Sequence, residues 1–412
     1  MGRWQGGLED LVTRIDTTDF LVVGAGVIGL NIARELKRRH PDASVTVLEK
    51  EPRTGEHASG RNSGVLHAGF YYTADSLKAK FTRDGNRALT EYCEEKGIFL
   101  NRCGKLVVAA TEAEDRLIDE LLARGRNNGV ELQEVTADEA REIEPRAKTL
   151  RRAIYSPTTS SADPHAVIAQ MTQDAHDEGI DIRYDAGYLK SDGNIVTTRA
   201  GRFEAGHLVN AAGLHADQVA RDFGFSKDYA ILPFKGIYLK SKEPPGTYRT
   251  HIYPVPDLDY PFLGVHFTIT VDGVTKIGPT AIPAFWRENY RGLERFDLRD
   301  LVEIGLRSAS LFTSSQFSFS KLAITEMKKY SRRHLVSLAA KLATGVELKN
   351  FTEWGKPGIR AQLVNTKERK LEMDFVLEGD HRSTHVLNAV SPGWTCSIPF
   401  SAYVVDFLES HL

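Results

Sequence analysis

The chain has 412 residues, 41% of them hydrophobic and 26% charged, and its formal net charge is −2. These values are typical of a soluble globular protein of one or two domains, and they give no basic surface for a nucleic acid. Three cysteines without metal-ligand spacing exclude a disulfide framework and indicate a reducing, cytoplasmic location. No apolar run reaches the roughly 18 to 20 residues of a membrane span, which leaves only peripheral membrane association open.

The first predicted element is a short amphipathic helix over residues 3–16, where apolar residues recur at helical spacing. We expect this helix to pack against its own protein rather than against a membrane. Glu9 and Asp10 argue against a transit peptide, because such peptides are poor in acidic residues.

Residues 20–49 carry the most informative pattern. An apolar strand leads into Gly24-Ala25-Gly26-Val27-Ile28-Gly29, followed by a helix, a second strand and Glu49. The three glycines permit a tight turn, close approach of a pyrophosphate and close packing of the helix on the strand. The helix N-terminus favours the pyrophosphate, and Glu49 is placed to bind the ribose hydroxyls. The spacing therefore predicts a site for an adenine dinucleotide.

The elements that follow indicate an interrupted cofactor domain. A polar, glycine-rich loop over 55–69 precedes a helix over 77–92, a strand over 104–109 and a charged surface helix over 111–127. Asp163-Pro164 is typical of an N-cap and first turn, which predicts another helix there.

The pattern changes after about residue 230. Short β-rich pieces at 236–239 and 262–270 are separated by Pro, Gly and Asp, which favours an antiparallel sheet. Helices are expected from about 297 to 344. A strand at 386–388, a glycine turn at 391–393 and a final helix to about 409 complete the pattern.

The loop at 60–69 distinguishes between the two common dinucleotides. NAD and FAD share the ADP half, but this loop places polar donors and small residues beyond the phosphate site, as an extended FAD requires. The chain here resembles the FAD-dependent D-amino-acid oxidase superfamily and, more narrowly, the L-2-hydroxyglutarate dehydrogenase/oxidase family. The stretches that carry the resemblance are His67 to Tyr72, Arg102 to Leu106, Asn210 to Gly213, Ile252 to Pro256, Phe262 to Thr268, Gly358 to Leu363, Asn388 and Ser391 to Gly393.

This resemblance implies an α/β fold of the D-amino-acid oxidase type: a Rossmann-like FAD-binding domain with an inserted antiparallel-sheet substrate domain. The expected FAD-binding domain is discontinuous, at 1–95, 150–228 and 346–412, and the expected substrate domain covers 96–149 and 229–345. The expected FAD contacts are Gly24, Gly26, Val27, Ile28, Gly29, Glu49, Lys50, Ser59, Arg61, Asn62, Ser63, Gly64, Ala212, Gly213, Gly358, Ile359, Gly393, Trp394 and Thr395.

Two histidines are the candidate catalytic residues. By resemblance the loop of His67 passes beside the flavin, so a neutral His67 could accept the substrate hydroxyl proton while hydride leaves for flavin N5. Covalent attachment to the flavin, or a bond within the loop, are the alternatives. His266 alternates with apolar neighbours on its strand and is the second candidate, with a purely structural histidine as its alternative. No metal site is expected.

Candidate substrate contacts are Tyr72, Lys235, Tyr253, Thr268 and Arg360. A fixed Arg360 guanidinium can hold a carboxylate with two hydrogen bonds, although a salt bridge between domains would use the same side chain. The resemblance also aims the N-terminus of the last helix, expected to begin at Gly393, at the flavin edge that becomes negative on reduction.

Several positions depart from the narrower family. The chain has Lys235-Gly236-Ile237 where the family generally has Arg-Gly-Glu, and Ile269 where it has a basic residue. Thr280 replaces Asn, and Trp286 replaces Lys before Arg287. Because a buried dicarboxylate needs cations at both ends, these departures leave the exact substrate open.

The combined interpretation is an FAD-dependent oxidoreductase acting on the CH–OH group of a small L-2-hydroxy acid, with L-2-hydroxyglutarate, oxidised to 2-oxoglutarate, as the leading candidate. Oxygen or a quinone-linked acceptor would receive the electrons. An amine or amino-acid oxidase on the same scaffold, or a flavin-binding protein without turnover, are the alternatives.

Overall fold

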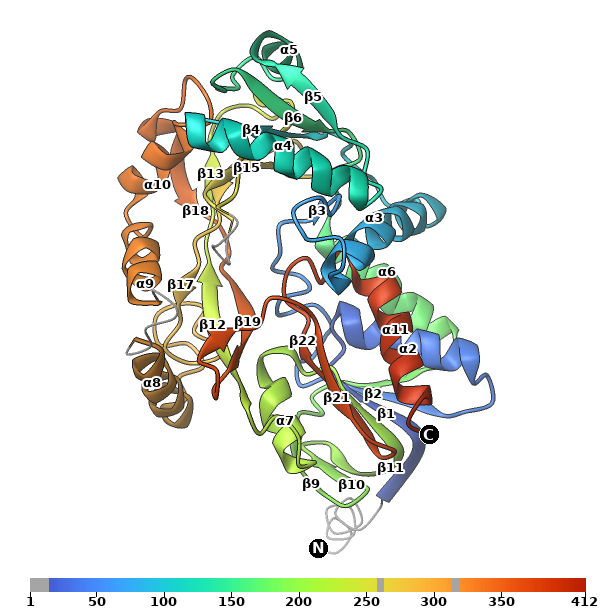
Figure 1. Ribbon diagram of the computed structural model, residues 1–412. Helices are drawn as coiled ribbons and strands as arrows, with labels where there is room; N and C mark the ends of the chain where they lie inside the picture. Colours follow the sequence, from blue (N-terminus) through green and yellow to red (C-terminus); the bar gives the residue numbers. More distant parts are fainter. Residues whose placement is uncertain (1–14, 258–262, 313–318) are drawn as a thin grey trace, which may run out of the picture.

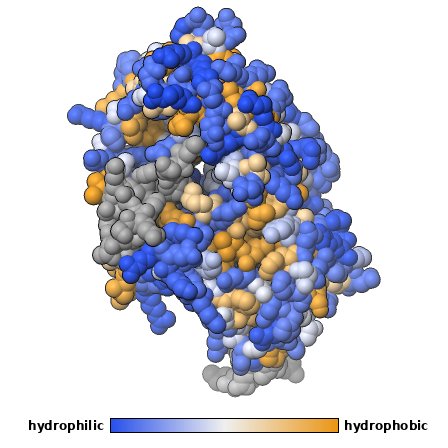
Figure 2. All heavy atoms as spheres, in the orientation of Figure 1, coloured by the Kyte–Doolittle hydropathy of each residue, from blue (hydrophilic) through white to orange (hydrophobic). Residues whose placement is uncertain are grey.

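The computed structural model describes residues 15–257, 263–312 and 319–412. Figure 1 shows two large sheets at opposite ends of the molecule, with the short strand β3 (Val65–Leu66) between them. Figure 2 shows mostly hydrophilic residues at the periphery of this face and hydrophobic residues gathered towards its middle.

The first large sheet has a parallel core. Its order is β21-β22-β11-β1-β2-β8, in which β22, β11, β1, β2 and β8 are parallel, while β21, β10 and β9 are antiparallel additions. The bounds are β1 (Ile15–Val23), β2 (Val45–Leu48), β8 (Asp181–Arg183), β9 (Tyr188–Asp192), β10 (Ile195–Thr198), β11 (Gly201–Asn210), β21 (Val376–Gly379) and β22 (Ser383–Asn388). Every residue of β2 is buried, as expected for a parallel strand covered on both faces.

Helices cover this sheet. Figure 1 shows α2, α6 and α11 together on one side, and α11 packs against both α2 and α3. Their bounds are α2 (Val27–Arg39), α3 (Leu77–Glu95), α6 (Pro164–Asp177), α7 (Ala216–Asp222), which follows the 3₁₀ turn η1 (Gly213–His215), and α11 (Ser397–Glu409). The expected N-cap of α6 is confirmed, because the Asp163 side chain accepts a hydrogen bond from the His165 N–H at 2.9 Å.

Glycines hold the first turn of the fold close to its neighbours. Gly24 has φ +105°, and a Cβ there would lie 2.6 Å from the Ala211 carbonyl oxygen. A Cβ on Gly29 would lie 1.9 Å from the Gly24 carbonyl oxygen. Any side chain at either position would separate α2 from β1 and β11, so the predicted fingerprint geometry is present.

The second large sheet is mostly antiparallel. Its order is β18-β13-β16-β15-β14-β4-β6-β5, and only β14 and β4 run parallel. The bounds are β4 (Lys105–Val108), β5 (Gln133–Thr136), β6 (Arg152–Ser156), β13 (Leu239–Ser241), β14 (His251–Pro254), β15 (His266–Ile269), β16 (Thr275–Gly278) and β18 (Phe351–Trp354). The expected antiparallel region after residue 230 is confirmed.

Two smaller sheets and further helices connect the large ones. The four-stranded sheet β17-β12-β19-β20 consists of β12 (Tyr229–Gly236), β17 (Ile282–Pro283), β19 (Gly358–Asn365) and β20 (Lys370–Leu371), and β3 pairs with β7 (Ser160–Ser161). The remaining helices are α4 (Glu112–Asn127), α5 (Ala137–Ile143), α8 (Leu298–Phe312), α9 (Phe319–Lys328), α10 (Arg332–Ala339) and the 3₁₀ turn η2 (Leu348–Asn350). In the parts of the chain described here, no helix has the length and apolar character needed to cross a membrane.

Two expectations about elements change, and a third lies partly outside the described residues. The helix expected over 3–16 lies outside the described residues except for Ile15 and Asp16, which begin β1 instead because they pair with β11. The last helix begins at Ser397 rather than at Gly393, since residues 393–396 form a turn closed by the bond from the Cys396 N–H to the Pro392 carbonyl. Residues 258–262, in or near the β-rich piece expected at 262–270, are not described.

The division into two domains stays a prediction. β6 and β18 pair with strands of the expected substrate domain, although both lie outside its expected bounds, 96–149 and 229–345. We propose boundaries that place both strands with the second large sheet.

Candidate active site

A cavity of about 1050 Å³ lies where the carboxyl ends of β1, β2 and β11 meet the four-stranded sheet. The parallel strands end here, which is where open α/β sheets bind their ligands. The expected FAD contacts that line this cavity are Gly24, Gly26, Val27, Ile28, Glu49, Lys50, Ser59, Arg61, Asn62, Ser63, Ala212, Gly213, Gly358, Ile359, Gly393, Trp394 and Thr395. Gly29 and Gly64 do not line it. The volume suits an extended dinucleotide, since sites for drug-sized ligands are about 300–1,000 Å³.

Glu49 closes one end of the cavity. It follows β2, is 8% exposed, and its carboxylate accepts hydrogen bonds from the Ala25 N–H at 3.1 Å and the Glu51 N–H at 2.9 Å. Burial raises the pKa of Glu49, against the effect of these two bonds. The carboxylate thus sits against the glycine turn, as binding of a ribose at this end requires.

We expect Glu49→Ala to weaken FAD binding by roughly 10- to 150-fold, because a hydrogen bond to a charged group contributes about 1.5–3 kcal/mol. Titration of the apoprotein with FAD, followed by flavin fluorescence, measures the change. Glu204→Ala, an exposed glutamate of β11, is the matched control. Unchanged affinity in Glu49→Ala would remove Glu49 from the ribose site.

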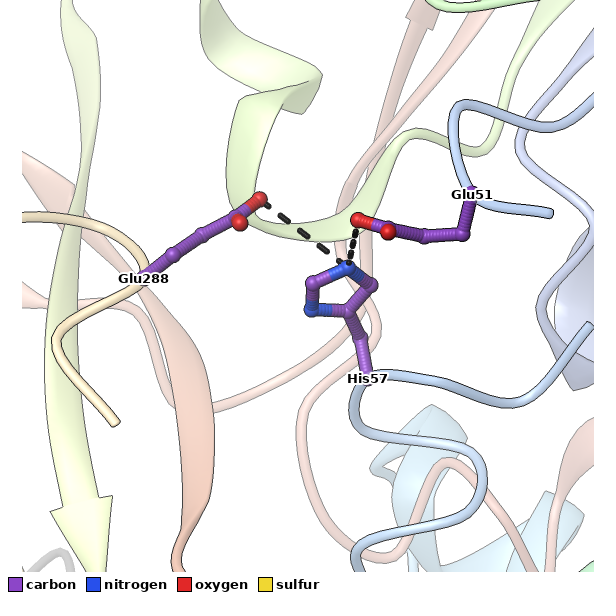
Figure 3. Close-up of side chains that lie close together, drawn as sticks. All are labelled: Glu51, His57 and Glu288. Atoms are coloured by element: carbon purple, nitrogen blue, oxygen red, sulfur yellow. Dashed lines mark hydrogen bonds and ion pairs between the residues drawn. The ribbon is translucent and has the colours of Figure 1, made fainter. Parts of the chain in front are cut away.

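An ion-pair network joins the loop after β2 to the segment after β17. Figure 3 shows its centre, where His57 Nε2 lies 2.8 Å from Glu51 Oε1 and 4.0 Å from Glu288 Oε1. The ligand atoms of these three residues lie within 4.8 Å of one another, a spacing that could suit a metal ion. However, Lys50 contacts both carboxylates, and Arg295 bonds to Glu51 at 2.5 Å and to Glu288 at 2.6 Å. The cluster is therefore a salt-bridge network with its own cations.

Through this network the segment after β17 is held as one wall of the cavity. Glu288 also bonds to His215 at 3.0 Å, while Tyr290 bonds to His57 Nδ1 at 2.7 Å. Burial opposes ionisation of Glu288, but the bonds to His215 and Lys50 outweigh it and lower its pKa. Glu288 is thus ionised at neutral pH and holds this wall in place.

We expect Glu288→Gln to speed FAD loss by about tenfold, because a neutral amide cannot balance Lys50, His215 and Arg295 together. The rate of FAD loss is measured by diluting the holoprotein and following the fluorescence of the released flavin. Glu294→Gln, an exposed change in the same segment, should leave it unchanged. Equal rates in all three proteins would show that the wall does not retain the cofactor.

His67 lies at the other end of the cavity, directly after β3. Its backbone N–H donates to Thr395 Oγ1 at 3.2 Å, and the Thr395 hydroxyl donates to the Val65 carbonyl at 3.2 Å. Burial lowers the pKa of His67 well below its usual range, and the charge of Lys105 adds to this effect. His67 is therefore neutral at pH 7, and it lines the cavity.

Arg360 faces the same end of the cavity from β19. Its strand approaches the cofactor loop so closely that a Cβ on Gly358 would lie 2.4 Å from the Arg61 carbonyl oxygen. This close contact between two backbone segments fixes the position of β19, and therefore of the Arg360 Cα, relative to the loop that carries Arg61. A guanidinium and a neutral imidazole are thus placed on one cavity by elements that are far apart in sequence.

The other predicted site residues do not line this cavity. His266 stacks on Tyr253 with ring centroids 3.8 Å apart, and its Nδ1 lies 2.8 Å from the Gly264 carbonyl oxygen. Burial lowers the pKa of His266 to about 3. Thr268 is fully buried, and Tyr72 lies under the Lys78 ammonium at 5.9 Å. Their roles as a base or as substrate contacts stay predictions.

The departures from the narrower family lie mostly inside the protein rather than on the cavity wall. Lys235 donates to Asn289 Oδ1 at 3.1 Å, and the Thr280 hydroxyl donates to the Lys235 carbonyl at 2.9 Å. The Trp286 indole donates to the Glu294 carbonyl at 3.0 Å, and Ile269 is 2% exposed in the sheet. Each of these four residues therefore makes internal contacts, and their effect on the choice of substrate stays a prediction.

Sequence reasoning missed several polar residues of this region. Tyr238 lines the cavity, and Lys276 lies over its ring at 5.0 Å and donates to the Ser63 carbonyl at 3.4 Å. Lys105 is fully buried in β4. The available signal was a lysine within an apolar strand, because burying a charge is costly unless the charge is paired and hydrogen-bonded.

The family model described as FAD dependent oxidoreductase matches residues 19–406. The chain belongs to this family. Curated relatives match along almost the whole chain. The chain is 36% identical over 401 residues to L-2-hydroxyglutarate dehydrogenase of Escherichia coli (strain K12), and the match covers 96% of this chain and 94% of the relative. It is 36% identical over 417 residues to the mitochondrial L-2-hydroxyglutarate dehydrogenase of Homo sapiens, covering 95% and 88%.

Solved structures confirm the fold of this FAD dependent oxidoreductase. L-alpha-glycerophosphate oxidase from Mycoplasma pneumoniae, with FAD bound, matches with a TM-score of 0.74 at 21% identity, covering 96% of this chain and 95% of that one. Glycine oxidase from Geobacillus kaustophilus matches with a TM-score of 0.71 at 21% identity, covering 96% of each chain. The predicted D-amino-acid oxidase-type fold and the FAD cofactor are confirmed.

Proposed function

We propose that this oxidoreductase converts L-2-hydroxyglutarate to 2-oxoglutarate. The observation that carries the proposal is the 36% identity with L-2-hydroxyglutarate dehydrogenases along almost the whole chain. The cavity supports it, because Arg360 and the neutral His67 line the same end. An acid with a neighbouring hydroxyl needs such a pair, one group for the carboxylate and one for the hydroxyl proton.

In the proposed reaction Arg360 binds the carboxylate beside the reacting carbon and fixes the direction of its C–H bond. His67 accepts the hydroxyl proton as the alkoxide develops. Bound FAD supplies the two-electron acceptor. Gly393, Trp394 and Thr395 line the cavity, and their backbone N–H groups would favour negative charge on the cofactor.

The first test is the anaerobic visible spectrum of the holoprotein, before and after addition of L-2-hydroxyglutarate. We expect the flavin bands to bleach and 2-oxoglutarate to form in an amount equal to the flavin. D-2-hydroxyglutarate and sarcosine are the comparison compounds. Bleaching by sarcosine but not by L-2-hydroxyglutarate would replace the proposal with an amine oxidase, and no bleaching by either would favour a flavoprotein without turnover.

We further propose that oxygen or a quinone-linked acceptor takes the electrons, and that a quinone-linked reaction would go with peripheral membrane association. Reoxidation of the bleached protein by dissolved oxygen and by a short-chain ubiquinone, compared at equal concentrations, distinguishes the two. Sedimentation with lipid vesicles tests the association.

A further inference from the structure

Lys105 combines complete burial with the absence of a partner. Its side chain is 0% exposed, and among the described residues its Nζ has no hydrogen-bond partner. The Nζ lies 4.6, 4.8 and 5.2 Å from the ring centroids of Phe70, Tyr71 and Tyr253. These three rings form an aromatic cage around the amine. Such contacts stabilise an ammonium only in part, so a fully buried lysine still lacks the anion that would balance it.

Two further polar atoms of the cage also lack a partner. The Tyr71 and Tyr253 hydroxyls are buried without a hydrogen bond to any residue that the structure describes. Buried polar groups are almost always hydrogen-bonded, and three such atoms in one cage indicate a missing acceptor. Tyr71 is partly accessible, whereas Phe70 and Tyr253 are 0% and 1% exposed. A ligand would therefore reach Nζ on the side of Tyr71.

The cage belongs to the region of the reaction. Phe70 and Tyr71 lie on the loop that begins with His67, and Tyr253 stacks on His266. Two basic groups from different strands, Lys105 and Arg360, both act on the pKa of His67. Two cations near this end of the site suit an anion with more than one negative charge.

The other buried lysines already have partners. Lys235 donates to Asn289, and Lys276 donates to the Ser63 carbonyl. The charge of Asp374 partly offsets the effect of burial on the pKa of Lys78. Burial alone lowers the pKa of Lys105 to about 7, because no acidic group opposes it. Lys105 is thus the cation best able to serve a ligand.

We propose that Lys105 determines specificity for dicarboxylates: its ammonium, with the Tyr71 hydroxyl, binds the carboxylate far from the reacting carbon while Arg360 binds the near one. The inference rests on the proposed function and adds the residue that recognises the second charge. It also answers the need for a second cation that Lys235, bonded to Asn289, does not meet. A monocarboxylate would leave the cage unpaired and gain nothing from it.

The test compares glutarate with pentanoate, which has the same carbon chain and one carboxylate. Binding to the oxidised holoprotein is followed through the flavin spectrum in wild type, Lys105→Met, Tyr71→Phe and the control Lys341→Met, an exposed lysine. We expect Lys105→Met to weaken glutarate binding by about 100-fold and leave pentanoate within about threefold, and Tyr71→Phe to weaken glutarate severalfold. The control should match wild type for both acids.

Two results would overturn the proposal: wild type binding glutarate no better than pentanoate, or Lys105→Met weakening both acids equally. If Lys105→Met does not retain flavin, Tyr71→Phe decides, because it removes one hydroxyl and keeps the ring. Selective loss of glutarate binding together with no turnover of L-2-hydroxyglutarate by wild type would keep Lys105 as a dicarboxylate contact and reject the proposed substrate. If wild type turns over L-2-hydroxyglutarate but the variants lose glutarate and pentanoate binding equally, the proposed substrate is kept and the role of Lys105 is rejected.

Discussion

His67→Asn is expected to lower kcat for L-2-hydroxyglutarate by about 10²- to 10⁴-fold, the usual contribution of a positioned general base. KM should change much less, because the carboxylate contacts remain. Asn retains the backbone N–H that donates to Thr395, so the loop after β3 stays in place. Steady-state kinetics of the flavin-loaded protein measure the loss, with the exposed His381→Asn as control.

The pH profile separates a base from a structural histidine. Burial and neighbouring cations lower the pKa of His67, so its imidazole is neutral at pH 7 and becomes protonated only on acidification. Protonated imidazole cannot accept the hydroxyl proton. Wild-type kcat/KM should therefore fall as the pH falls below the usual histidine range. An acid limb that persists in His67→Asn would show that another group is the base.

Arg360→Met is expected to lower kcat/KM by roughly 30- to 5,000-fold, because removing one member of a buried charge pair costs about 2–5 kcal/mol. Arg360→Lys should lose less, about 1.5–3 kcal/mol, since it keeps the charge but not the two-point geometry. The measurement is kcat/KM per bound flavin, with Arg382→Met, an exposed arginine, as control. If Arg360→Met retains flavin and wild-type kcat/KM, the guanidinium does not bind the substrate.

Much of the cofactor site could be predicted because it depends on residues close together in sequence. The glycine turn, Glu49 and the N-cap of α6 each follow from spacing within one βαβ unit or one helix, and the structure places them as expected. The order of secondary structure then predicted the second sheet. Local rules were sufficient for these features.

The substrate end depends on contacts between distant segments. The cage of Lys105 joins β4, the loop after β3 and β14, and no periodicity in the sequence brings these three together. Trp286 and Ile269 likewise depart from the family pattern, but only the structure shows that they make internal contacts. Alternation along a strand says which residues share a face, but not which face meets the cofactor.

The parallel core of the first sheet also has a consequence for how the protein acquires its flavin during synthesis. β1 and β2 come from the N-terminal region, yet β22 completes the parallel core beside β11, and α11 packs on α2. The cavity wall around Glu288 and Arg295 is added by the middle of the chain. A nascent chain on the ribosome therefore cannot assemble the pocket until residues 383–409 have emerged, and we expect flavin capture to follow translation rather than accompany it.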